Sequence, residues 1–115
     1  MAFSEFERKK IERAAGQFME KRRPPVDIRS EVDLLYKIEK QSVVIYEVRS
    51  VWNKPEEKME LPIAKATYVQ KSKIWKIYWH RADMKWHGYP PKPEVKTIEQ
   101  FFSEVEKDPH ACFFG

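Results

Sequence analysis

The sequence has little cysteine or glycine and no long apolar run. Its 115 residues include one cysteine, Cys112, and three glycines. A lone cysteine excludes an internal disulfide bond and is typical of a reducing compartment, so we expect a cytoplasmic protein. The few glycines leave no glycine-rich phosphate loop. No segment approaches the ~20 apolar residues of a membrane-spanning helix, and the first residues lack the apolar stretch of a secretory signal, so we expect no membrane partner.

Charged and aromatic residues are abundant but unevenly placed. The formal net charge is +4, and aromatic residues make up 14% of the chain. Residues 63–93 contain seven basic side chains and one acidic one, whereas residues 94–115 contain two and five. The basic segment is either neutralised by the rest of the fold or turned toward an anionic partner. The length is that of one domain, about 100–150 residues, so we expect residues 1–115 to form a single domain.

Two segments have the caps and the periodicity of helices. Ser4 with Glu7, and Thr97 with Gln100, have the spacing of capping boxes, in which each side chain binds the other residue's backbone N–H. Apolar residues recur at helical spacing after each box. The aromatic end of the chain is expected to pack against the body or a partner. The predicted helices cover residues 4–22 and 97–107, and a tail over 108–115 follows.

Alternating apolar residues between the helices predict strands. Lys40 and Gln41 are expected to form the turn of a first hairpin, and the polar residues 53–60 are expected to form a loop. A helix, a meander and a second helix make an α+β domain: an antiparallel sheet of four to five strands with the N-terminal and C-terminal helices packed on one face. The strands predicted within 32–89 cover residues 32–38, 42–52, 63–69, 74–80 and 84–89.

The expected register of the last two hairpins divides their residues between two faces. A pairing across the turn at 70–73 sets Ala64 opposite Trp79, a small residue facing a large one. A turn at Ala82 and Asp83 would then pair Trp79 with Trp86. The face expected to form the core consists of Ala64, Ala66, Tyr68, Trp75, Ile77, Trp79 and Trp86.

The opposite face collects basic residues around one tyrosine. Single-stranded nucleic-acid binders use such a face, with lysines for the phosphates and a ring for base stacking. The solvated face of any antiparallel sheet is also polar, and an acidic protein or a second copy of the chain is a further alternative. The candidate nucleic-acid-binding residues are Lys65, Lys76, Tyr78, His80, Lys85 and His87.

The sequence supports a metal site or an active site less than it supports a binding surface. Asp33 with Glu47 and Arg49 resembles the acid pairs of nucleases, but arginine cannot act as a base, and Glu47 with Arg49 fits an ion pair. We therefore expect no cofactor, no metal and no catalytic residue, and we favour a binding protein over an enzyme. The residues that a zinc site would require are His80, His87, His110 and Cys112.

Several motifs together resemble a known family. They are residues 75–89 (WKIYWHRADMKWHGY), 3–25, 64–68 (AKATY) and 112–115 (CFFG). The sequence resembles the small bacterial proteins grouped as domain of unknown function 3024, over essentially the whole chain. The resemblance implies a stand-alone bacterial protein, and it supplies no catalytic residue, cofactor or partner.

The sequence therefore predicts a small non-catalytic binding or accessory protein, with nucleic acid as the candidate ligand of the basic aromatic face. The alternative is a homodimer or protein-interaction module with no role in nucleic-acid binding.

Overall fold

The protein is built on an antiparallel meander, described here by a computed structural model for residues 3–51, 53–109 and 112–113. Five strands lie in the order β1-β2-β3-β4-β5, and a sixth, β6, pairs with β4. This confirms the α+β class, and β6 is an addition to the predicted strands. The elements are α1 (Glu5–Arg22), the 3-10 helix η1 (Val26–Ile28), β1 (Val32–Glu39), β2 (Ser42–Val51), β3 (Lys54–Val69), β4 (Ile74–His80), β5 (Trp86–Gly88), β6 (Glu94–Val95) and α2 (Ile98–Lys107).

Both helices begin at the predicted capping boxes. The Ser4 amide donates to Glu7 Oε1 at 2.9 Å, and the Glu7 amide donates to Ser4 Oγ at 3.2 Å. Thr97 and Gln100 repeat the arrangement at the start of α2. These bonds satisfy backbone donors that have no partner within the helix. In the part of the chain that the structure describes, no helix is long and apolar enough to cross a membrane.

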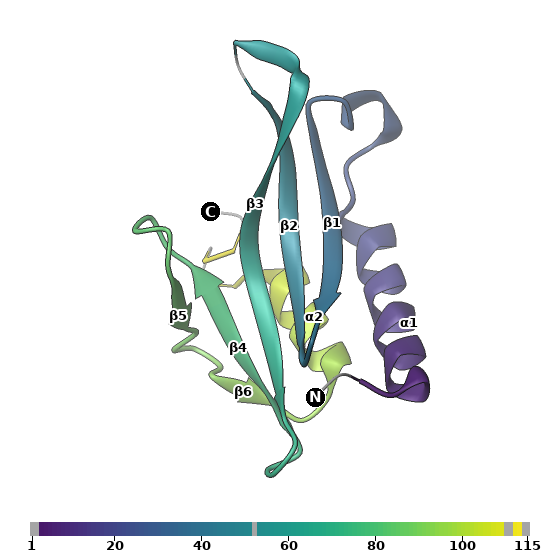
Figure 1. Ribbon diagram of the computed structural model, residues 1–115, viewed down its shortest axis with the longest axis vertical. Helices are drawn as coiled ribbons and strands as arrows, with labels where there is room; N and C mark the ends of the chain where they lie inside the picture. The colour runs from purple at the N-terminus through teal and green to yellow at the C-terminus, as the bar shows by residue number, and fades with distance from the viewer. Residues whose placement is uncertain (1–2, 52, 110–111, 114–115) are drawn as a thin grey trace.

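The two helices pack on one face of the sheet and leave the other uncovered. In Figure 1, α2 lies behind the sheet and α1 runs beside β1, so the face toward the viewer carries no helix. Apolar residues of α1 and α2 share one core with alternate residues of the strands, which is the arrangement the sequence predicts. Fully buried members of this core are Ala15, Val43, Ile45, Ala64, Ala66, Tyr89, Phe101 and Val105.

The prediction of a loop over residues 53–60 is wrong, because β3 already begins at Lys54. This part of β3 pairs with β2 in the upper half of Figure 1, beyond the helices. Residues 56–60 are all exposed, so neither face requires apolar residues there. Period-two alternation arises only where one face is buried, and the strand therefore has no alternation to detect. An ion pair between Lys37 and Glu60, 2.7 Å long, joins this part of β3 to β1 across β2.

The C-terminal tail packs against the body through Phe113. Its ring lies 4.8 Å from that of Tyr89, and 5% of the residue is exposed. The Tyr89 hydroxyl donates to Glu104 Oε2 of α2 at 2.9 Å. The expected packing of the tail is thus confirmed for Phe113, and residues 110–111 and 114–115 lie outside the described part of the chain.

The assignment of faces predicts different costs for two neighbouring substitutions in β4. Ile77 is 1% exposed on the covered face, so Ile77→Ala should lower the free energy of unfolding by about 2–5 kcal/mol. Tyr78 lies on the uncovered face, so Tyr78→Ala should cost about 1 kcal/mol or less. Urea denaturation followed by circular dichroism measures both, and equal costs would contradict the assignment.

Candidate nucleic-acid interface

The pairing of β3 with β4 determines which residues share the uncovered face. Ala66 lies opposite Ile77 and Ala64 opposite Trp79, so the predicted register of this hairpin is confirmed. The alternate pair, Lys65 and Tyr78, therefore lies on the other face. Thr67 and Lys76 form the next pair on that face.

The pairing of β4 with β5 differs from the expected one by a single residue. Trp86 lies opposite His80 rather than Trp79, and His87 lies opposite Trp79. A shift of one residue exchanges the two faces of a strand. Trp86 therefore belongs to the uncovered face, and its predicted place in the core is wrong.

The turn between β4 and β5 explains this shift. A two-residue hairpin turn at Ala82 and Asp83 would favour residues that readily adopt positive φ, such as asparagine and glycine. The chain instead forms a longer turn over residues 81–85, closed by the Arg81 amide donating to the Lys85 carbonyl at 3.1 Å. Met84 takes the left-handed conformation within it, with φ of 64°. The extra residue moves Trp86 into register with His80.

Five residues form a basic aromatic cluster on the uncovered face, which we call the β4–β5 patch. Lys65 Nζ lies 5.0 Å from the centre of the Tyr78 ring and 4.9 Å from that of the Trp86 ring, within range of cation–π attraction to both. The His80 ring meets the Trp86 ring edge-on at 4.9 Å. The patch consists of Lys65, Lys76, Tyr78, His80 and Trp86.

The two lysines of the patch form no ion pair within the described residues, although Glu94 lies opposite Lys76 in the pairing of β4 with β6. Among the same residues, no carboxylate lies within ion-pair distance of His80. Burial lowers the pKa of the Lys65 ammonium from its ordinary value, and the charge of Glu39 partly opposes this effect. A phosphate placed beside Lys65 would favour its charged form.

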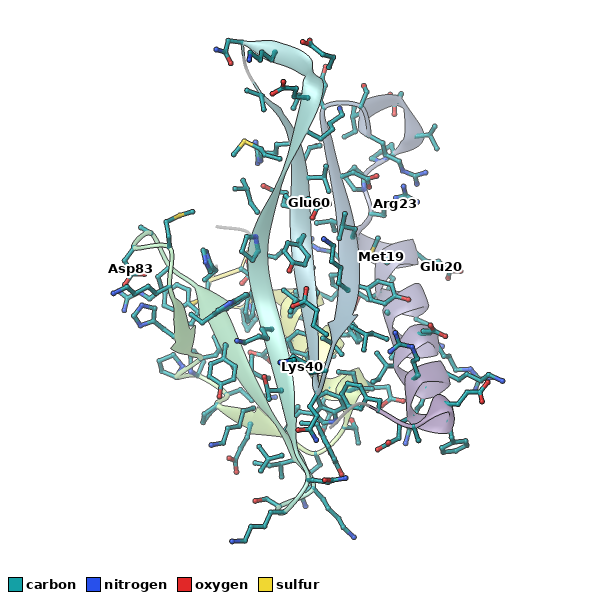
Figure 2. The ribbon with its side chains drawn as sticks, in the orientation of Figure 1. Met19, Glu20, Arg23, Lys40, Glu60 and Asp83 are labelled. Carbon is teal, nitrogen blue, oxygen red and sulfur yellow. The ribbon has the colours of Figure 1, made fainter. Side chains whose placement is uncertain are left out.

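A shallow hollow adjoins the patch on the same face. It has a volume of about 410 Å³, and its lining includes Tyr46, Trp86 and the buried Val44. Lys40, at the turn between β1 and β2 in Figure 2, also lines it. An apolar floor between two aromatic residues is a surface on which a flat ring can stack.

Charged side chains on the β1 side of the uncovered face already have partners within the sheet. Lys37 pairs with Glu60 at 2.7 Å, and the Tyr46 hydroxyl donates to Glu39 at 3.1 Å. Lys37 and Glu60 therefore neutralise one another, whereas Glu39 keeps its negative charge and lines the hollow together with Lys40.

Two of the predicted site residues do not join the patch. Lys85 lies exposed in the turn before β5. His87 shares the other face with Trp79, and its Nε2 lies 2.8 Å from Asp83 Oδ2. The hydrogen bond with His87 lowers the pKa of the Asp83 carboxyl from its ordinary value. Figure 2 shows Asp83 at the outer end of this hairpin, away from the middle of the sheet.

The residues weighed for metal and nuclease chemistry are separated or paired. His80 and His87 lie on opposite faces, and His110 is outside the described residues. Within residues 3–51, 53–109 and 112–113, no three His, Cys, Asp or Glu side chains are grouped to hold a metal ion. Glu47 and Arg49 form the predicted ion pair, at 2.5 Å.

Comparison with known proteins adds a family and no function. The family described as Domain of unknown function (DUF3024) matches residues 3–115. No curated protein and no solved structure matches the chain.

The observed register of β4 and β5 can be tested by NMR spectroscopy. Removing the indole in Trp86→Ala should change the chemical shifts of the His80 ring and of the Lys65 side chain, because both lie about 5 Å from it. The Trp79 indole signals should move less. Two-dimensional NMR spectra of the two proteins make this comparison, and a dominant change at Trp79 would support the pairing of Trp79 with Trp86 instead.

Proposed function

The chain belongs to the DUF3024 family, and from the geometry of its uncovered sheet face we propose that it is a non-catalytic protein that binds single-stranded nucleic acid. The observation that carries the proposal is the position of Lys65 between the Tyr78 and Trp86 rings, with no carboxylate paired to it among the described residues. Lysines beside accessible rings are the combination that binds phosphate and base together.

Different residues of the patch bind different parts of the nucleic acid. Lys65 and Lys76 attract the phosphates, a base stacks on Tyr78 or Trp86, and the His80 ring supports Trp86 edge-on. A second base fits the hollow between Trp86 and Tyr46. Stacking on an aromatic side chain is worth about 1–3 kcal/mol per base.

A single strand suits this surface better than a duplex. Bases can reach aromatic side chains on a sheet only when they are unstacked. In a duplex the bases are already stacked and paired, so the rings would contribute little. The proposed preference is therefore for single-stranded DNA or RNA, with little dependence on base sequence.

Fluorescence anisotropy with a labelled oligothymidylate tests the proposal. Release of two phosphate counterions, one for each lysine of the patch, predicts that affinity falls about sevenfold when salt rises from about 50 to about 200 mM. Tyr78→Ala should remove a stacking platform and lower affinity about tenfold, and Lys76→Glu should weaken binding and reduce its salt dependence.

Lys71→Glu is the matched control for Lys76→Glu. Lys71 is an exposed residue of the turn between β3 and β4, outside the patch, and the substitution changes the net charge equally. Binding by the patch predicts little effect of Lys71→Glu. Equal loss in the two variants, or no binding at low salt, would refute the patch as a nucleic-acid surface.

A second candidate function is self-association through β1. This strand is at the edge of the sheet, and it follows Val26 and Ile28, which are 76% and 39% exposed. Edge strands present unpaired backbone groups that can bind another strand.

Light scattering after size-exclusion chromatography tests this candidate. Pairing through β1 predicts twice the mass of one chain, with a shift toward the single-chain mass on dilution. A single-chain mass at every concentration would exclude self-association.

A further inference from the structure

A cleft at the other side of the molecule has the features of a small-ligand site. It lies where the start of α1, the turn between β3 and β4 and the start of α2 converge, near the N label in Figure 1. Its volume is about 190 Å³. Tyr68 and Trp75, which line it, belong to the helix-covered face, so the cleft is separate from the β4–β5 patch.

Aromatic side chains form the apolar part of this cleft. Phe3 stacks on Trp75 with 5.5 Å between the ring centres and 28° between the planes. Tyr68 meets the same indole at 5.1 Å. Phe6 lines the cleft while 79% exposed, which is a high exposure for a large apolar residue. A bound ring would cover part of this aromatic surface and remove it from water.

Three lysines line the same cleft. Lys10 comes from α1, Lys73 from the turn between β3 and β4 and Lys96 from the link between β6 and α2, and none of them has a carboxylate within ion-pair distance among the described residues. The one carboxylate in the lining, Glu7, accepts the Ser4 amide in the capping box. That hydrogen bond lowers the pKa of Glu7 from its ordinary value, so Glu7 stays ionised and the lining carries a net charge of about +2 at neutral pH.

We propose that this cleft binds a small organic anion that carries an aromatic ring, with a phosphate monoester as the best-matched anionic group. The ring lies against Phe3 and Phe6, because Trp75 is only 7% exposed, and the anion lies among Lys10, Lys73 and Lys96. A phosphate monoester carries a charge of about −1.5 to −2 at neutral pH, which balances the lining and relieves the repulsion between the lysines. The volume of about 190 Å³ suits one ring and one phosphate. The proposal does not depend on nucleic-acid binding by the opposite face.

Phenyl phosphate is the smallest probe with both parts of the proposed ligand. Titration into ¹⁵N-labelled protein should give saturable shifts in the Trp75 indole and in amides at the start of α1. Phenol and inorganic phosphate each lack one part and should bind at least tenfold more weakly. Adenosine 5′-phosphate, with adenosine as its control, tests whether a larger ring is accepted.

Two neighbouring lysines of α1 provide a matched pair of variants. Lys10→Gln should weaken phenyl phosphate binding about fivefold, the effect of one partly solvated ion pair. Lys9→Gln removes the same charge from a residue outside the lining and should change the affinity less than twofold. Both positions are exposed, so the fold should be unaffected, as circular dichroism can verify.

Three results would overturn the proposal. The first is equal binding of inorganic phosphate and phenyl phosphate, which would mean that the rings make no contribution. The second is equal weakening by Lys9→Gln and Lys10→Gln, which would show attraction to general positive charge. The third is the absence of saturable shifts at millimolar phenyl phosphate.

Discussion

The burial of a single sheet face beneath two helices is the constraint on which the rest of this structure depends. Ala64 and Ala66 are fully buried there, and their small side chains leave room for Trp79 and Ile77 on the neighbouring strand. Because side chains alternate along a strand, the same pairing places Lys65 on the opposite face. The core and the candidate binding surface are therefore two consequences of one register.

Local sequence patterns predicted the structure correctly wherever a single interaction determines the local conformation. The capping boxes located the starts of both helices, because each satisfies backbone donors within four residues of chain. The small-against-large pattern of Ala64 and Trp79 gave the correct register of β3 and β4, because a shift of one residue would bury lysine.

The sequence did not predict the structure where a segment has no buried face, because such a segment needs no apolar pattern. The first part of β3 is exposed on both faces, so its residues have the composition of a loop and form a strand only through pairing with β2. Trp86 was misplaced because one extra residue in the turn, Met84, exchanges the faces of β5. The lack of asparagine or glycine at Ala82 and Asp83 was the available signal for a longer turn. Tyr46 was missed although the predicted first hairpin already implied its face.

The ion pairs show how far the basic segment, residues 63–93, is neutralised within the fold. Of the seven Lys and Arg residues in 63–93, only Lys92 forms an ion pair with a described residue, to Glu104 at 3.6 Å. The acidic C-terminal segment therefore neutralises the basic one only in part, through this pair and through Glu94, which lies opposite Lys76. Three of the remaining lysines line the two surfaces, Lys65 and Lys76 on the patch and Lys73 in the cleft, and Lys71 and Lys85 lie exposed in turns. Cation–π contacts hold Lys65 in place but leave its charge unneutralised, which suits the binding of an anion.

The most direct test of the central claim is a map of where a single strand binds. A short oligothymidylate titrated into ¹⁵N-labelled protein should shift the amides of Lys65, Lys76, Tyr78 and His80 and the Trp86 indole, while the helix signals stay in place. Shifts confined to α1 and α2, or none at low salt, would contradict the claim that the uncovered sheet face is the binding surface.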